Sequence, residues 1–368
     1  MPRTTTTLCL ALLCLHSVAQ KSPRLLEKMG LKDLQQKVNY IPPKSFTSLA
    51  HTGSDSVSFY RSRTSTVEGF YMSRTEVTNK EYREFVQYAR DSIAHTLLQH
   101  FHPGLPAIDW AAPIDWKDKR LDGLMNTEDE QVFGKRSIDP EKVVYAIVTP
   151  GGTEQISIYP DTLVWIRDFT NSYNEPMVKN YFSHASYDDF PVVGVSQEQA
   201  IAFCHWKTIR VNQSLKTGTA AGTEIKVMLP GNAEWESAAF DGMDTVRTRK
   251  KGGNYLYNFG NIIEGSRVTV KTYRDDGYFY TAPVKSFPVG AYDLFDMKGN
   301  VSEWTSTTME EVMNAELKET KAKTIYVVKG GGWNSSPFYL QAGVCQFFPA
   351  DAAHSYIGFR YMIRIKSQ

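Results

Sequence analysis

Residues 292–304 read YDLFDMKGNVSEW, and this stretch decides the fold. Within it, Lys298-Gly299-Asn300 predicts a turn, because glycine and asparagine adopt a positive φ at low cost. The next residues, Val301 to Trp304, alternate between apolar and polar side chains, which predicts a half-buried strand. Further on, residues 329–333 (KGGGW) place three glycines before a tryptophan. Such a run indicates a backbone that passes close to an aromatic ring.

These segments resemble the signatures of the formylglycine-generating-enzyme (sulfatase-modifying factor) domain. The family patterns GN-x-x-EW, R/K-GGSW and a terminal GFR correspond here to residues 299–304, 329–333 and 358–360. The resemblance covers roughly residues 43–365. It implies an α+β fold, a variant of the C-type-lectin-like fold, with a long insertion. Other segments in the family's order are Phe70-Tyr71-Met72, Glu76-Val77-Thr78-Asn79, 191–195 and 229–236.

The composition is that of a globular protein with a sizeable core. The 368 residues are 42% hydrophobic and carry a net charge of +1, so no basic field suggests nucleic acid as a partner. No apolar run is long enough to span a membrane. A basic loop formed by Arg247, Arg249, Lys250 and Lys251 could meet peptidoglycan, acidic lipid or a protein, or simply be solvated.

The N-terminus has the pattern of an export signal. Arg3 precedes the apolar run 8–15, and Ser17-Val18-Ala19 fits a cleavage site, which predicts a signal peptide over residues 1–19 and a mature start at Gln20. The alternatives are a buried hydrophobic helix and a lipoprotein signal that lipidates Cys14, although Leu13 is a poor residue for that signal. Either version of the signal predicts an exported protein.

A polar, Lys-rich segment, residues 20–45, is interpreted as a linker or docking arm ahead of a domain that spans 46–365. Cys204 and Cys345 are the two cysteines beyond the signal. An exported compartment would permit a disulfide between them. A buried free thiol is the simpler interpretation of Cys204, which lies on a predicted helix with an apolar face.

Three helix starts are readable. Thr78 with Glu81, and Ser196 with Gln199, form predicted capping boxes, and Gly231 begins a third helix. Between the first two lies an insertion over about 99–190, which contains a predicted hairpin of Val143–Val148 and Thr153–Tyr159. Its tryptophans could anchor a partner or form a satellite core. They are Trp110, Trp116 and Trp165.

The insertion extends the resemblance to the gliding-motility lipoprotein K group (GldK/PorK), with the related protein J as the near alternative. The segments that carry it are 90–94, 159–162, 174–177 and 180–182. This resemblance implies a non-catalytic structural component of the type IX protein secretion and gliding machinery. It implies a self-associating ring on the periplasmic face of the outer membrane, a partner called protein N, and contact with that membrane or with peptidoglycan. Members usually carry a lipidated cysteine, and this chain departs from that pattern.

The family's enzymes use two closely spaced cysteines that bind copper and oxidise a substrate thiol. Here Ser335 and Leu340 stand at about those positions, and Cys345 comes later and alone. Neither a hydroxyl nor a leucine can replace a soft thiolate as a Cu(I) ligand. We therefore expect no catalytic residue and no copper. The competing hypotheses are a thiol-oxidising enzyme and a lectin-like glycan-binding module that stacks sugars on Trp333 or Phe338.

The resemblance also implies structural Ca²⁺, which prefers hard oxygen ligands. The residues that match the first family site are Asn261, Ile262 (carbonyl), Asp276 and Tyr278 (carbonyl). Those that match the second are Asn300, Val301 (carbonyl) and Glu303. The alternative is that Asn300 and Glu303 simply satisfy backbone groups of the turn.

Overall fold

The computed structural model describes residues 25–366, except for 55–56, 128, 130–134, 150–151, 170–173, 216–222, 240–254, 261, 265–266, 270–272 and 314–322. The predicted signal peptide, Cys14 and the basic loop at 247–251 lie outside the described residues. Within the described part of the chain, no helix is both long and apolar enough to cross a bilayer.

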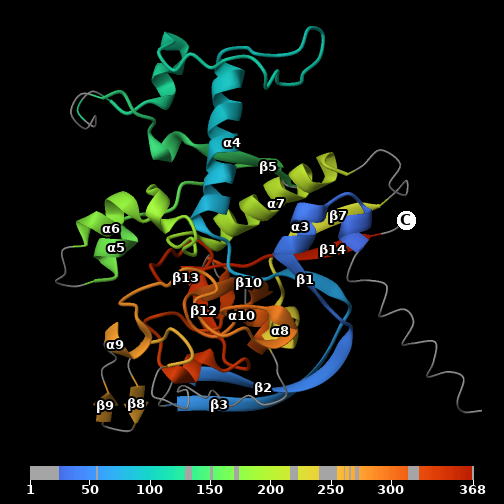
Figure 1. Ribbon diagram of the computed structural model, residues 1–368, viewed down its shortest axis with the longest axis vertical. Helices are drawn as coiled ribbons and strands as arrows, with labels where there is room; N and C mark the ends of the chain where they lie inside the picture. The colour runs from blue at the N-terminus through green and yellow to red at the C-terminus, as the bar shows by residue number, and fades with distance from the viewer. Residues whose placement is uncertain are drawn as a thin grey trace, which may run out of the picture.

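An antiparallel sheet at the centre joins strands from both ends of the domain. Its order is β1 (Val38–Ile41), β4 (Phe70–Ser73), β14 (Met362–Lys366) and β7 (Glu224–Met228). All four side chains of β4 are buried. The last strand of the chain therefore closes the domain by pairing with β4 and β7 (Figure 1).

A second sheet holds the stretch that decides the fold. Its order is β12 (Gln346–Pro349), β11 (Ile325–Lys329), β10 (Ser302–Thr308) and β13 (Ile357–Gly358), and only the β10–β13 pairing is parallel. The first four side chains of β10 are all buried, so the prediction of a half-buried strand is wrong. The polar residues Ser302, Glu303 and Thr305 of β10 are buried, whereas Ser306 is exposed.

Helices α4 (Asn79–Leu97) and α7 (Gln197–Gln213) pack together beside the central sheet. Both predicted starts are confirmed: Thr78 Oγ1 accepts from the Glu81 amide at 3.2 Å, and Ser196 forms a reciprocal capping box with Gln199. Helix α8 (Asn232–Ala239) begins where expected, after Gly231. Tyr82, Phe85 and Phe203 join α4 and α7 in the main apolar core.

The N-terminal segment is part of the packed domain. Helices α2 (Leu25–Lys28) and α3 (Lys32–Lys37) lead directly into β1. Leu26, Leu34 and Val38 are buried in the main core. In its described part, the segment interpreted as a linker or arm is thus docked, and packing begins ahead of the expected boundary at residue 46.

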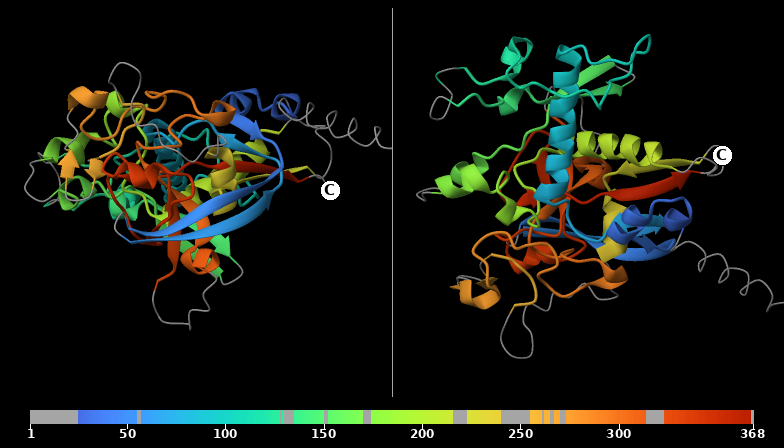
Figure 2. Two further views of the ribbon diagram at one scale, coloured as in Figure 1. Left: turned by 90° about the horizontal axis from the view of Figure 1, so that it is seen from below. Right: turned by 45° about the horizontal axis from the view of Figure 1, so that its top comes forward.

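Two hairpins lie around the periphery. The long strands β2 (Lys44–Ser54) and β3 (Val57–Val67) curve together along one side of the molecule, seen from below in Figure 2. Strands β8 (Ile262–Glu264) and β9 (Arg267–Thr269) form a short second hairpin. Four further short elements follow helix α8 in the described part of the chain: α9 (Tyr273–Asp276), η6 (Ala291–Asp293), α10 (Met309–Met313) and η7 (Pro337–Leu340).

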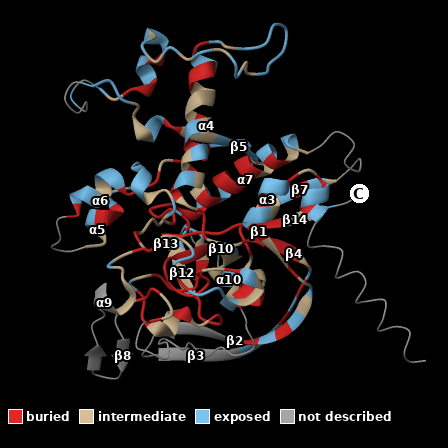
Figure 3. Cartoon of the chain, viewed as in Figure 1, coloured by how far each residue is buried: buried red, intermediate tan, exposed pale blue. Residues whose placement is uncertain are grey.

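The insertion forms several small elements around the upper part of α4 and beside it (Figure 1). The predicted hairpin is confirmed as β5 (Val144–Thr149) with β6 (Gly152–Ser157). Much of the insertion is exposed, in contrast to the buried centre of the domain (Figure 3). The other elements are η1 (Lys119–Leu124), η4 (Pro140–Lys142), α5 (Val164–Arg167), α6 (Glu175–Asn180) and η5 (Ala185–Tyr187).

The three tryptophans of the insertion have different environments. Trp165 is 1% exposed and packs in a satellite core with Val164 and Tyr181. Trp116 packs at the edge of another small cluster, with the Arg90 guanidinium 5.1 Å from its ring centre. Trp110 is 47% exposed. The satellite-core interpretation therefore fits Trp165, and Trp110 alone of the three is well placed to meet a partner.

The predicted turn at 298–300 is confirmed, and its glycine is required. Gly299 has φ 85° and Asn300 has φ 64°. A Cβ at Gly299 would lie 2.3 Å from the carbonyl oxygen of Asn258. Only glycine fits here, because both the backbone conformation and the space exclude a side chain.

We predict that Gly299→Ala destabilises the domain by about 3 kcal/mol or more, measured by urea unfolding. Gly104→Ala is the matched control, since Gly104 also has a positive φ (74°) but no atom lies within 4 Å of the place that its Cβ would occupy. That control should lose only about 1–2 kcal/mol, from the left-handed backbone alone. Equal losses in the two variants would contradict the close approach at Asn258.

Candidate functional site

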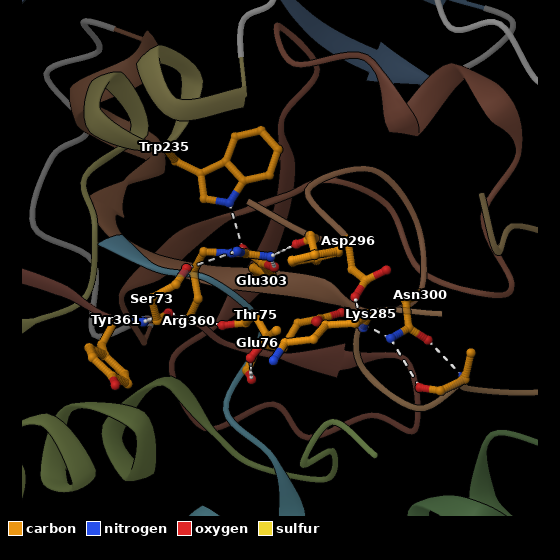
Figure 4. Close-up of polar contacts among 12 residues, drawn as sticks. Ser73, Thr75, Glu76, Trp235, Lys285, Asp296, Asn300, Glu303, Arg360 and Tyr361 are labelled. Carbon is orange, nitrogen blue, oxygen red and sulfur yellow. Dashed lines mark hydrogen bonds and ion pairs between the residues drawn. The ribbon is translucent and has the colours of Figure 1, made fainter. Parts of the chain in front are cut away.

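A fully buried ion pair lies at the centre of the fold (Figure 4). The guanidinium of Arg360 donates to both oxygens of Glu303 at 2.6 Å, and the two residues are 0% and 1% exposed. The indole Nε1 of Trp235 donates to the same carboxylate at 2.7 Å. The two ends of the family pattern, GN-x-x-EW and GFR, thus meet in one contact.

Arg360 also holds neighbouring backbone. Its Nη1 donates to the Ser73 carbonyl at 3.2 Å, and its Nη2 donates to the Phe295 carbonyl at 2.9 Å. The amide of Tyr361 donates to Ser73 Oγ at 3.2 Å. One arginine side chain therefore joins β4, β10 and the loop that leads into the 298–300 turn.

Two further carboxyls lie close to this ion pair. Asn300 Nδ2 donates to Glu76 Oε1 at 3.0 Å, and the Lys285 amide donates to Asp296 Oδ2 at 2.8 Å. The remaining oxygens, Glu76 Oε2 and Asp296 Oδ1, are buried without a partner among the described residues. Burial raises the pKa of Glu76 well above its usual value and that of Asp296 to about 6. The charge of Asp296 adds to the effect of burial on Glu76.

A second buried polar cluster lies beneath β2 and α8. Lys329 Nζ lies 3.0 Å from Glu236 Oε1, and the two side chains are 0% and 1% exposed. Lys329 also donates to Cys345 Sγ at 3.5 Å, while Asn232 and Ser48 complete the hydrogen bonds of Glu236 at 3.0 and 2.8 Å. Burial raises the pKa of the Cys345 thiol, although Lys329 opposes this shift.

The positions that match the enzyme cysteines serve the backbone and the core. Ser335 Oγ accepts from the Gly332 amide at 2.9 Å, and the Ser335 carbonyl accepts from the Gly260 amide at 2.6 Å. Leu340 is 0% exposed and packs with Tyr255 and Phe259. Both residues are thus integrated into the fold.

The remaining cysteines are buried free thiols. Cys204 and Cys345 form no disulfide with each other. Cys204 lies on α7 within the main core, as the simpler interpretation of its sequence predicted. Cys345 instead meets Lys329 in the second polar cluster.

The residues expected at the second calcium site already have protein partners. Asn300 Oδ1 accepts from the Ala282 amide at 2.8 Å. Both oxygens of Glu303 accept from Arg360. This donor set does not fit a calcium ion while the Glu303–Arg360 pair is formed, and the carbonyl of Val301 alone would not hold one. The arrangement agrees with the alternative in which Asn300 satisfies backbone groups.

The first expected calcium site is only partly described. Asn261 lies outside the described residues, and so does the side chain of Ile262. Asp276 Oδ1 accepts from the Tyr278 amide at 3.0 Å, so the two residues do lie together. A carboxylate beside a backbone carbonyl is suitable chemistry for Ca²⁺. A calcium ion at this place remains a prediction.

The architecture and these motifs define a sulfatase-modifying-factor fold. The family model described as sulfatase-modifying factor enzyme 1-like domain matches residues 38–365. The chain therefore belongs to this family, and its fold is the formylglycine-generating-enzyme variant of the C-type-lectin-like fold, as the sequence motifs predicted.

Curated relatives include active and inactive members. The formylglycine-generating enzyme of Thermomonospora curvata is 28% identical over 235 residues, which are 59% of this chain and 70% of that enzyme. That of Mus musculus is 25% identical over 326 residues, 80% of this chain and 66% of the enzyme. Inactive C-alpha-formylglycine-generating enzyme 2 of Bos taurus is 32% identical over 153 residues, 39% of each chain. Among solved structures, PvdO from Pseudomonas aeruginosa has 17% identity and a TM-score of 0.48, with 89% of this chain and 94% of that chain covered.

Sequence reasoning missed both buried polar clusters as units. In the sequence alone, Glu76, Asp296 and Arg360 stand out only as parts of motifs. The available signal was a charged residue inside an otherwise apolar motif, which indicates a buried pair. This signal does not show which charged residues pair with one another.

We predict that Asp296→Asn stabilises the domain at neutral pH. Because the folded-state pKa of Asp296 is raised to about 6, the wild type loses stability as pH rises from about 4 to 6. Asparagine keeps the acceptor for Lys285 and can donate to Glu76, but it does not titrate. Urea unfolding should show a gain of about 1–3 kcal/mol at pH 7.5 and almost none at pH 4.

The matched control is Asp351→Asn, because Lys323 lowers the pKa of this exposed carboxyl. Its loss should slightly destabilise the protein at neutral pH, the opposite sign. If both variants show the same pH dependence, burial does not raise the pKa of Asp296.

We also predict that calcium raises the melting temperature and that EGTA lowers it, because an ion that binds only the folded state stabilises that state. Asp276→Ala should abolish the calcium effect, and Asp351→Asn should retain it. Differential scanning fluorimetry measures both. An unchanged melting temperature of the wild type in millimolar calcium would contradict the site.

Proposed function

We propose that this chain is a non-catalytic member of its family and a structural component of the type IX secretion and gliding machinery. In this proposal it self-associates in a ring with a protein N-like subunit on the periplasmic face of the outer membrane, where peptidoglycan is a further contact. The single observation that supports it most is the state of positions 335 and 340. A serine bonded within its own turn and a core leucine occupy the places of the copper ligands.

The other thiols offer no substitute for that pair. Cys345 is 1% exposed, and burial raises its pKa, which keeps the thiol protonated and weakly nucleophilic. Cys204 is also buried, on α7, and burial raises its pKa as well. A family member without enzymatic activity has a precedent in the inactive paralogue of Bos taurus, by its name.

Several large apolar side chains of the insertion are exposed. Leu105, Val148 and Leu163 are 61%, 78% and 58% exposed, and Trp110 is 47% exposed. Large apolar side chains at the surface of one region favour a protein interface. Segments of the same insertion carry the resemblance to the protein K group, which is why we assign the assembly role to it.

The glycan-binding alternative has less support. The ring of Trp333 stacks on Phe169 at 5.6 Å with an angle of 4° between the planes, and its Nε1 donates to the Ser355 carbonyl at 3.0 Å. One face and the polar edge of this indole are therefore already used.

We predict that Leu105→Ser and Val148→Ser leave the free energy of unfolding within about 0.5 kcal/mol, because both side chains are exposed. The same changes should weaken assembly with the partner subunit at least tenfold, or about 1.4 kcal/mol. Native chromatography measures the oligomer, and cargo secretion measures function in cells. Val289→Ser is the control, since Val289 is 48% exposed but lies outside the insertion.

The enzymatic alternative is tested on the same protein. Wild type supplied with Cu(I), oxygen and a cysteine-containing peptide should oxidise no thiol. A measurable oxidation that disappears in Cys345→Ser, together with normal assembly of the Leu105 and Val148 variants, would overturn the proposed function.

A further inference from the structure

Residues of α3, α4 and α7 line a hollow at the surface of the domain. Figure 1 shows where these three helices lie. This main hollow has a volume of about 550 Å³, and Trp110 of the insertion forms part of its wall. A second hollow, of about 290 Å³, adjoins it, because Lys37 and Glu84 line both. The two hollows are neighbours with part of their walls in common, and we call the pair the groove.

One wall of the main hollow is aromatic. The rings of Tyr88 and Trp110 stack at 4.9 Å with 23° between their planes. The Arg210 guanidinium lies 5.7 Å from the centre of the Tyr88 ring. This wall offers a flat apolar surface with a cation beside it, and Trp110 keeps 47% of its surface exposed.

The ring of Trp206 also lines this hollow. Trp206 is only 6% exposed, and its Nε1 is buried with no partner among the described residues. An occupant of the hollow therefore meets the ring of Trp206 and not its N–H. Trp206 lies against Phe85 and Tyr88 at 5.3 and 6.1 Å, which fixes its ring.

The groove is also lined by cations that lack ion-pair partners. Five lining cations take part in none of the ion pairs between described residues. They are Lys32 and Arg210 in the main hollow, and Arg74, Lys80 and Lys285 in the second. In addition, Arg74 Nε is buried and unpaired among those residues. The groove therefore presents unneutralised positive charge at both ends.

Acidic residues of the walls balance only part of this charge. Asp91 pairs with Arg90, and Glu81 pairs with Lys207 at 2.5 Å, so neither carboxylate is available to the lining cations named above. The other acidic residues of the walls are Asp33, Glu84 and Asp189, which are fewer than the five cations named above. The surplus is positive, and a ligand that complements it carries negative charge.

We propose that this groove binds an extended acidic peptide segment of a protein partner, with an apolar or aromatic residue beside each acidic one. The carboxylates pair with Arg210 and, in the second hollow, with Arg74. The neighbouring apolar residue packs on the wall formed by Tyr88 and Trp110. The inference rests on the proposed function in one respect: it takes the ligand to be a protein.

Two features favour a peptide over a small anion. The charged positions are distributed over two adjoining hollows, so one small ion cannot reach both sets. A peptide in extended form presents carbonyl acceptors along its length and side chains to alternate sides, which suits a groove with an aromatic wall and separate cations.

The test uses the full mature chain and a short fluorescein-labelled peptide of alternating glutamate and tyrosine, followed by fluorescence polarisation. Peptides with glutamine or lysine in place of glutamate are the ligand controls. We expect binding of the glutamate peptide that weakens with salt, and at least tenfold weaker binding of the other two. Trp110→Ala removes the exposed ring of the aromatic wall, and Arg210→Gln removes the charge. Each should weaken binding about fivefold to tenfold, and Lys179→Gln, which removes an exposed cation on α6, should not.

Equal binding of the glutamate and lysine peptides, or unchanged affinity in both groove variants, would overturn the proposal. An oligosaccharide of hyaluronan is included as an acidic glycan. If it binds and the peptides do not, the groove recognises glycans and the proposal is wrong.

These outcomes are independent of the proposed function. If groove variants no longer bind the peptide but still form the ring, peptide binding and ring assembly are separate properties. If the wild type oxidises thiols, the assembly role is wrong, but the peptide-binding result still holds.

Discussion

The buried contact between Glu303 and Arg360 is the constraint on which the rest of the structure depends. Neither charge reaches water, so each requires the other, and loss of one partner from such a pair costs about 3–5 kcal/mol. Through its hydrogen bonds to the Ser73 and Phe295 carbonyls, the arginine also fixes backbone on two other segments.

Much of the fold could be predicted from local signals. The caps at Thr78 and Ser196, the hairpin of the insertion and the turn at Gly299 are each decided by a few neighbouring residues. The burial of β10 could not be predicted in this way. Alternating polarity normally means that one face meets water, but here Glu303 faces a buried arginine from a distant segment.

The candidate site also combines features that neighbouring residues predict with contacts that they do not. The expectation that Ser335 and Leu340 stand in place of the enzyme's cysteines comes from the motif alone. The contacts among Glu76, Asp296 and Asn300 are not visible in the sequence, because Asn300 and Glu76 are 224 positions apart in the chain. A single sequence gives the residue types at such positions but not their pairing, and only the folded chain shows that two acids share one buried place.

Helix α4 gives the domain a lever arm. Its first turns are fixed in the main core through Tyr82 and Phe85, and its last turns carry the start of the insertion (Figure 2). Its 19 residues correspond to a rigid rod about 28 Å long. A force on the far end is therefore transmitted to the core with little bending.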